Sequence, residues 1–410
     1  MLEPAVTIYT LDNGIRVVHQ YSSSPVLYCG MMIHTGSRDE LIHEQGLAHF
    51  IEHTVFKGTK KRKWNHILAR MEEVGGESNA YTTKEETCFY TVSLTEYLER
   101  AVDLLADITF NSVFPDNELD KEKGVILDEI NAYKDNPAED IIDKFEEQLY
   151  EQHSLGYDIL GSPKHVKSFN STKVQEFIQR TYNTDEMVLS IVGNVSPDKV
   201  IKLAKKYLGI YPTNLRTFQR DAYTDKKVIK KDKKQKTNQV HYVFGGHAYS
   251  CVDDKRLPLL LLNNMLGGPA MNSRLNVAIR EKKGYTYNIE SNYTMYTDTG
   301  IWSCYFSTDK DKLDKCLTII DKELSVFKKQ LLSSTQLHKA KKQMIGQIAI
   351  SQEYGMGNMT AAAKSILLFD KIDTMQQIYK DIEAIQPMEI IEVAKELFMD
   401  RDNFSHLLYY

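Results

Sequence analysis

The chain has 410 residues, of which 42% are apolar, and its 51 Lys and Arg side chains nearly balance 56 Asp and Glu side chains, for a net charge of -5. At ~150 residues per domain, this length predicts two or three domains. The balanced charge excludes a broad cationic surface, so we expect no nucleic-acid partner. No stretch approaches the ~18 consecutive apolar residues of a membrane-spanning helix, so we also expect no membrane partner.

The first 21 residues have neither a basic start nor an apolar segment, and they include Glu3 and Asp12. We therefore expect the folded protein to begin here, without a targeting segment. The five cysteines are scattered and form no CxxC pair, which argues against a disulfide framework and against a thiolate zinc site. Together these features predict a cytoplasmic protein.

The first half alternates between strand and helix patterns. The predicted strands are 5–10, 15–20, 26–34, 79–94 and 187–192, and the predicted helices begin at Gly46 and cover 64–74, 95–110, 116–133 and 138–152. The Asn13-Gly14 turn signal joins the first two strands. This order predicts an α+β domain that opens with a hairpin-bearing sheet.

Residues 213–237 are the one clear break in composition, because seven of the eleven residues from Lys226 to Lys236 are lysine. A patch for RNA or anionic lipid is one interpretation. A solvated linker that leads into an edge strand is the favoured one, since no aromatic residues interleave with the lysines to stack on bases.

The second half repeats the order of the first, with a predicted strand at 239–245, a helix at 255–266, strands within 285–306 and then long helices. Residues 118–130 resemble residues 336–348, and in that register Glu129 falls on Gln347. This similarity predicts a duplicated α+β unit in which one copy has exchanged a carboxylate for an amide. The expected domains are 1–212 and 226–410, joined by a linker at 213–225.

The densest cluster of reactive side chains is His49-Phe50-Ile51-Glu52-His53, an HxxEH motif. On a helix, residues four apart lie on one face, so His49 and His53 can offer imidazole nitrogens to one metal ion. Glu52 lies at the edge of that face, near a metal without having to bind it. The alternative is a surface helix with two unrelated histidines, but the apolar neighbours make the helix a buried one, where unpartnered polar groups are costly.

A catalytic zinc site needs a third protein ligand. Spacing alone does not choose among the nearby candidates, which are Glu72, Glu73, Glu77, Glu85, Glu86, Glu122 and Glu129. Glu122 and Glu129 stand out because they are seven apart on one predicted helix, so one can bind the metal while the other orients a ligand. An exposed acidic stripe is the alternative for this pair.

The HxxEH motif is the inverted zincin signature, and nearly the whole chain resembles the M16 family of zinc metallopeptidases, most closely its short two-domain type. The resemblance implies two homologous domains, each an antiparallel sheet packed with helices. It also implies one zinc ion per chain, held by His49, His53 and Glu129, with Glu52 as general base and Glu122 as supporting carboxylate. The segment Asn79-Ala80-Tyr81 is similar to the family's edge strand, which pairs with an extended peptide substrate.

In the second half, Arg280 and Tyr287 match the Arg/Tyr pair that family peptidases bring to the zinc. Considered by itself, the sequence favours a core tyrosine at position 287. Gly284 breaks the preceding helix, and alternation in the strand predicted after it places Tyr285, Tyr287, Ile289 and Tyr293 on one face. Likewise Leu266-Gly267-Gly268-Pro269 resembles the family's glycine-rich turn. It lacks the Gly-Lys-Ser/Thr ending of a phosphate loop.

The resemblance thus implies a zinc-dependent endopeptidase that acts on peptides or unfolded segments in a chamber. The family's chamber contains four such units and this chain supplies two, so we expect a homodimer, with a heteromeric partner as the alternative. A catalytically inactive M16-like scaffold or peptide-binding subunit is the competing function. A zinc amidohydrolase acting on small molecules is a third, which nothing in the second half supports.

Overall fold

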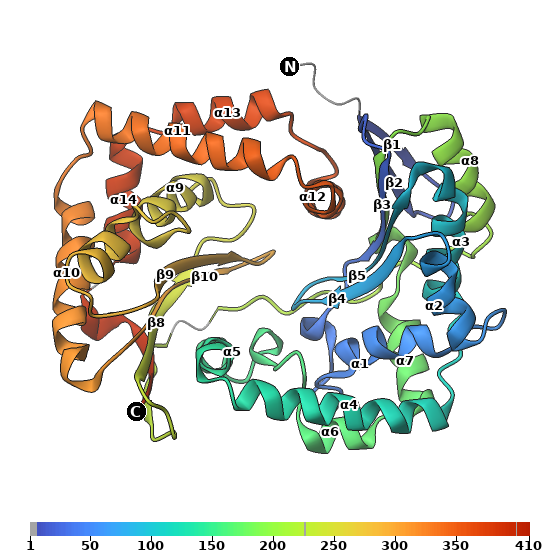
Figure 1. Cartoon of the computed structure of the whole chain (residues 1–410), viewed down its shortest axis with the longest axis horizontal. Helices are drawn as coiled ribbons and strands as arrows, with labels where there is room; N and C mark the ends of the chain where they lie inside the picture. Colours follow the sequence, from blue (N-terminus) through green and yellow to red (C-terminus); the bar gives the residue numbers. More distant parts are fainter. Residues whose placement is uncertain (1–5, 225–226, 399) are drawn as a thin grey trace. The chain divides into compact units, whose positions relative to one another are not determined.

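The computed structural model describes residues 6–224, 227–398 and 400–410. Their contacts divide the chain into two compact units (Figure 1). The first unit contains 1–131, 157–220 and 350–374, and the second contains 132–156, 221–349 and 375–410. Each unit therefore includes a segment from the other half of the sequence.

A six-stranded sheet, in the order β1-β2-β6-β3-β5-β4, forms the centre of the first unit. Its strands are β1 (Val6–Thr10), β2 (Arg16–Tyr21), β3 (Val26–Ile33), β4 (Glu77–Thr82), β5 (Thr87–Leu94) and β6 (Met187–Gly193). All neighbours are antiparallel except β2 and β6, which pair in parallel. Strand β4 is an edge of the sheet, with Ala80 opposite Phe89 of β5.

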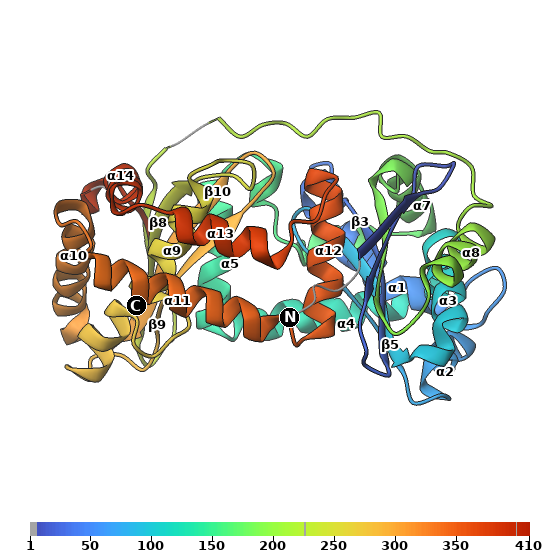
Figure 2. The same ribbon diagram turned by 90° about the horizontal axis from the view of Figure 1, so that it is seen from above.

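Helices cover both faces of this sheet. The larger core contains apolar side chains of the sheet and of α1 (Leu47–Thr54), α2 (Trp64–Glu72), α3 (Leu98–Phe110), α4 (Asp116–Lys134), α7 (Ser171–Thr181) and α8 (Pro197–Tyr207). The opposite face packs on α12 (Gly355–Phe369) through a second apolar cluster that includes Met32, Val188 and Met359. Figures 1 and 2 show α12 beside the sheet, on the side away from α3 and α8.

The second unit repeats this plan around a five-stranded sheet in the order β7-β11-β8-β10-β9. The strands are β7 (Lys230–Lys233), β8 (Val240–Ala248), β9 (Ile289–Met295), β10 (Gly300–Thr308) and β11 (Ser405–Tyr409). One core joins the sheet to α9 (Arg256–Gly267), α10 (Leu313–Lys329), α11 (Ser334–Ser351), α13 (Met375–Ala384) and α14 (Pro387–Leu397). The other face packs on α5 (Pro137–Leu149), and the Tyr409 hydroxyl donates to Asp140.

Each half of the sequence thus contributes one helix to the sheet of the other half. Helix α5 of the first half covers the second sheet, and α12 of the second half covers the first sheet. Both helices fill an apolar sheet face that would otherwise be exposed to water. The linker expected at 213–225 was placed between the two similar halves of the sequence, which are not the same as these two compact units. The expected domain boundary therefore stays a prediction.

The first part of the expected linker is held to the first unit by ion pairs. Arg216 and Arg220 both pair with Asp39, at 2.8 Å each, and the Asp39 side chain is fully buried. The nearby cations, Arg220 foremost, outweigh the effect of burial and hold the pKa of Asp39 below its usual value. The chain therefore leaves the first unit only after Arg220.

The expected α+β class is confirmed, although each sheet is mixed, because β7 and β11 also pair in parallel. Residues 230–233 of the lysine-rich segment themselves form an edge strand, β7, and all four are exposed. The strand expected after the segment is β8, which lies at the centre of the sheet and not at its edge. Strand β11 was not expected from the sequence. In the described part of the chain, no helix combines the length and apolarity needed to cross a membrane.

Candidate metal centre

Helix α1 carries the HxxEH motif and starts at a glycine with a left-handed backbone. Gly46 has φ +93°, and a Cβ there would lie 2.7 Å from the carbonyl oxygen of Leu160. The buried Glu40 carboxylate accepts hydrogen bonds from the N–H groups of Gly46 and Ala48, at 2.9 and 2.8 Å. It thus satisfies N–H groups that a helix start leaves unpaired, and its complete burial raises the pKa of this carboxyl well above its usual value.

Helix α4 contributes both glutamates that stood out in the sequence. Glu122 is only 7% exposed, and it lies on the same face as the buried Leu119 and Ile126. Glu129 follows two turns later and is partly exposed. The seven-residue spacing therefore does align two carboxylates, and the exposed-stripe alternative is wrong for Glu122.

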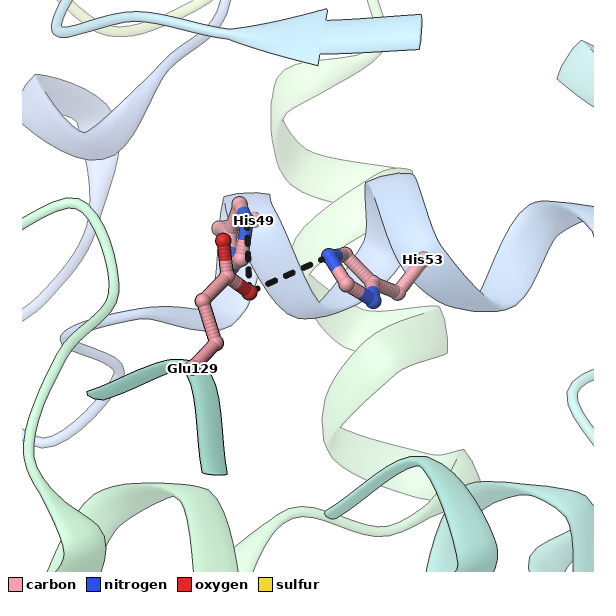
Figure 3. A group of neighbouring side chains, drawn as sticks. All are labelled: His49, His53 and Glu129. Atoms are coloured by element: carbon pink, nitrogen blue, oxygen red, sulfur yellow. Dashed lines mark ion pairs between the residues drawn. The ribbon is translucent and has the colours of Figure 1, made fainter. Parts of the chain in front are cut away.

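His49, His53 and Glu129 offer ligand atoms that all lie within 4.8 Å of one another. Oε2 of Glu129 is 3.8 Å from Nε2 of His49 and 3.6 Å from Nε2 of His53 (Figure 3). The two imidazole rings lie side by side, with their centroids 4.6 Å apart. Within the described ranges, this is the one group of three such residues close enough to share a metal ion.

The spacing fits a zinc ion better than it fits hydrogen bonds. Two ligand atoms of a tetrahedral zinc, each ~2.0–2.1 Å from the metal, lie about 3.3 Å apart, slightly less than the distances found here. Oε2 of Glu129 is buried and has no hydrogen-bond partner among the described residues. A buried carboxylate oxygen without a partner is costly, and a cation between the three side chains would remove that cost.

The protonation states also suit a metal site. Burial, reinforced by the neighbouring His53, lowers the pKa of His49 to about 3, so its imidazole is neutral and available as a ligand at neutral pH. For His53, the effect of burial is outweighed by the hydrogen bond to Glu122 and by nearby carboxylates, which raise its pKa. Its Nδ1 lies 3.0 Å from Oε1 of Glu122, an arrangement that leaves Nε2 facing Glu129.

Glu52 lies on the same helix, between the two histidines in sequence, and its side chain is partly buried. Its Oε2 is a buried oxygen without a hydrogen-bond partner in the parts of the chain that are described. Burial raises the pKa of this carboxyl above its usual value. A carboxylate with increased basicity beside a group of side chains that could hold a metal ion is suited to accept a proton.

The segment Asn79-Ala80-Tyr81 lies in β4, at the free edge of the sheet, and α1 packs against this strand. Edge strands present unpaired backbone groups that an extended peptide can use. Phe89, which lies opposite Ala80 on β5, is fully buried in the core.

Arg280 and Tyr287 belong to the second unit. Arg280 lies in the last turn of a short π-helical segment (Asn276–Glu281), a distortion often found at functional sites. Both line a pocket of about 570 Å³ that Asp309 and Lys312 also border. Tyr287 is 83% exposed, so the core interpretation of this tyrosine is wrong.

The other candidate carboxylates have other neighbours or stay in solvent. Glu85 is paired with Arg38, and Glu86 with Lys364. Two contacts were missed by reasoning from the sequence: the Glu40 cap of α1, and Lys57, which pairs with Glu122 at 2.6 Å. The Lys57 contact could have been anticipated, because a residue four positions after His53 lies on the same side of a helix and so near the same carboxylate.

Comparison with known proteins identifies the family to which this chain belongs. The family model for insulinase (peptidase family M16) matches residues 16–163, which include the HxxEH helix and α4. The uncharacterized zinc protease YmxG of Bacillus subtilis is 34% identical over 396 residues, which cover 96% of this chain and 95% of that protein. The chain belongs to peptidase family M16.

Other M16 relatives match over similar lengths. The mitochondrial-processing peptidase subunit beta of Bos taurus is 28% identical, over 97% of this chain and 83% of that protein. Residues 168–344 match the model named peptidase M16 inactive domain. A crystal structure of a Helicobacter pylori protease has the same fold, with a TM-score of 0.89 at 19% identity and 99% coverage of both chains. A Pseudomonas fluorescens structure, titled as a peptidase M16 inactive domain, gives 0.89 at 16% identity, with coverage of 99% and 97%.

Proposed function

We propose that this M16 protein is a zinc-dependent endopeptidase that cleaves peptides or unfolded segments, with one zinc ion per chain held by His49, His53 and Glu129. The observation that carries the proposal is the 3.6–3.8 Å spacing of two imidazole nitrogens and one unpartnered carboxylate oxygen. When bound, zinc supplies Lewis acidity, which polarises a carbonyl and lowers the pKa of water from 15.7 toward ~7.

Glu52 is the proposed general base. As the water oxygen bonds to the scissile carbonyl carbon, the Glu52 carboxylate accepts the proton that the water loses. It then gives this proton to the amide nitrogen when the carbon–nitrogen bond breaks, so that a free amine leaves. The raised pKa of Glu52, which follows from its burial, supports both steps because the group must bind and release a proton near neutral pH.

Other residues bind the peptide. The edge of β4, with Asn79, Ala80 and Tyr81, pairs with the extended substrate backbone. Arg280 and Tyr287 donate hydrogen bonds to the carbonyl oxygen as negative charge develops on it. The exposure of Tyr287 supports such a role, because a large aromatic side chain in solvent gains by contacting a ligand.

A quenched-fluorescence peptide pool and zinc analysis of the purified chain test this function. We expect one zinc per chain, cleavage that a chelator abolishes, and recovery when zinc is added back. Metal-free protein that cleaves nothing would instead support the alternative, a catalytically inactive M16-like scaffold or peptide-binding subunit. The model that matches residues 168–344 is itself named an inactive domain, which is compatible with that alternative.

We further propose that the active assembly is a cytoplasmic homodimer, because the chain supplies two α+β units and carries both the HxxEH motif and the Arg/Tyr pair. Sedimentation of the purified chain tests this. A stable monomer with full activity would contradict the dimer. Activity that needs a second gene product would support a heteromeric partner, and the bovine relative is itself named as a subunit.

A further inference from the structure

The Glu122 carboxylate contacts two side chains, His53 and Lys57, that are four residues apart in the sequence. His53 belongs to α1, and Lys57 ends the 3₁₀ segment that continues it (Val55–Lys57). Oε1 of Glu122 is 3.0 Å from Nδ1 of His53, and Oε2 is 2.6 Å from Nζ of Lys57. Each carboxylate oxygen thus has its own partner, and the carboxylate joins the lysine to a proposed zinc ligand.

We propose that Lys57 is a positioning residue of the zinc site, acting through Glu122 on His53. This inference rests on the proposed function, since it concerns the same metal centre. Lys57 holds one oxygen of Glu122, and the other oxygen accepts the Nδ1–H of His53. The imidazole is thereby fixed in the tautomer whose Nε2 lone pair faces Glu129.

The burial of Glu122 explains why it needs a cation. Its side chain is only 9% exposed, and a buried carboxylate is costly unless it is paired and hydrogen-bonded. His53, being neutral when it binds a metal, cannot supply the charge, whereas the Lys57 ammonium does.

Two other roles for Lys57 predict different results. As a bare positive charge near a metal ion, it would repel zinc, so its removal would tighten binding. As a charge at the end of α1, it would stabilise the helix without affecting zinc. The positioning role alone predicts that loss of Lys57 weakens zinc binding and that the effect depends on Glu122.

The experiment measures the zinc dissociation constant of the full chain by competition with a chromophoric chelator, together with the melting temperature of the zinc-free protein. Loss of an outer hydrogen-bonding partner of a metal ligand typically costs ~10–100-fold in affinity. We expect a loss in this range for E122Q and about tenfold for K57M. K57R should bind zinc nearly as tightly as the wild type because it keeps the charge.

The double variant K57M/E122Q decides whether Lys57 acts through Glu122. If it does, zinc binding in the double variant equals that of E122Q, because the lysine has no carboxylate left to orient. K364M is the matched control, since Lys364 pairs with Glu86 in the same unit but belongs to α12, which packs on the opposite face of the sheet from α1. It should leave zinc binding unchanged.

Unchanged or tighter zinc binding in K57M would overturn the inference, as would effects of K57M and E122Q that simply add. A fall in the melting temperature of zinc-free K57M with unchanged zinc affinity would assign the lysine to helix stability instead. If the wild type binds no zinc, or if H49A binds it as tightly as the wild type, the proposed function itself fails, and this inference fails with it.

Discussion

Met359 of helix α12 lies against Gly30 of strand β3, so closely that a Cβ atom on Gly30 would come within 2.7 Å of the Met359 methyl carbon. The hydroxyl of Ser190, on the neighbouring strand β6, donates to the Met359 carbonyl oxygen at 2.7 Å. A helix from the second half of the chain thus packs closely on the central strands of the first half, and a side chain larger than glycine at position 30 would require the buried Met359 side chain to move.

Gly30→Ala should therefore destabilise the protein by about 1–3 kcal/mol, the usual cost of overpacking a well-filled core. The midpoint of urea unfolding measures this. Gly346→Ala is the control, since a Cβ there meets nothing within 4 Å and the residue lies inside α11. It should stabilise by about 0.5–1 kcal/mol. Equal midpoints for Gly30→Ala and the wild type would mean that the Met359 side chain makes room for the added methyl group without cost.

Glu52→Gln should keep zinc and lose cleavage. The amide has nearly the shape of the carboxylate but does not accept a proton, and general-base catalysis typically contributes ~10²–10⁴ in rate. Zinc content and kcat on a quenched peptide, measured on one preparation, check both halves of the expectation. Glu72→Gln, an exposed position on α2, serves as control and should match the wild type. Cleavage by Glu52→Gln at near the wild-type rate would remove Glu52 from the mechanism.

His49→Ala should lose both zinc and cleavage, because it removes one of three ligands. His19→Ala makes a useful comparison: His19 is also buried, but it belongs to β2 and its Nε2 lies 3.4 Å from the Gly193 carbonyl oxygen. That variant should lose stability and keep its zinc. Zinc retained at one ion per chain in His49→Ala would mean that the metal is bound elsewhere.

The HxxEH helix illustrates what the sequence can predict. The spacing of His49 and His53 and the apolar residues between them are local features, so both the helix and its paired histidines were expected. The third ligand was not derivable from spacing, because it depends on how α4 packs against α1. Only the resemblance to M16 peptidases selected Glu129, which the structure brings beside both histidines.

Features that depend on long-range packing were missed or misjudged. An amphipathic pattern reveals that α12 has an apolar face, but not that this face packs on a sheet formed by the other half of the chain. The parallel pairing of β2 with β6 has the same cause, since strand order is set by packing between distant segments. Tyr287 was favoured as a core residue because of its alternation with apolar neighbours, yet β9 begins only at Ile289 and leaves the tyrosine outside the strand.

Zinc binding should weaken at low pH because His53 takes up a proton, and protonation of His49 should not contribute. His49, with its pKa near 3, stays neutral above about pH 4 and offers no competition from protons. The pKa of His53 lies above its ordinary 6.5, so a proton competes for its Nε2 as the pH falls through that range. The zinc dissociation constant should therefore rise about tenfold per pH unit below the pKa of His53.

Glu122→Gln supplies the control for this pH dependence. Losing the carboxylate removes interactions that raise the pKa of His53, so the onset should move to lower pH. Chelator competition between pH 5 and 8 measures both curves. A dependence on two protons per zinc in the wild type would contradict the assigned state of His49.

Tyr287→Phe should slow catalysis without affecting zinc or stability. Because Tyr287 is 83% exposed, removing its hydroxyl creates no cavity and leaves no buried group unpaired. Loss of one donor to a developing oxyanion typically lowers kcat by ~10²–10³. Tyr293→Phe should behave in the opposite way: the Tyr293 hydroxyl donates to the Tyr249 carbonyl at 2.7 Å, so its loss should cost about 0.5–1.5 kcal/mol of stability and leave kcat unchanged. If Tyr287→Phe cleaves peptides as fast as the wild type, the Tyr287 hydroxyl donates no hydrogen bond to the oxyanion. Arg280 would then be the one proposed donor left in the second unit.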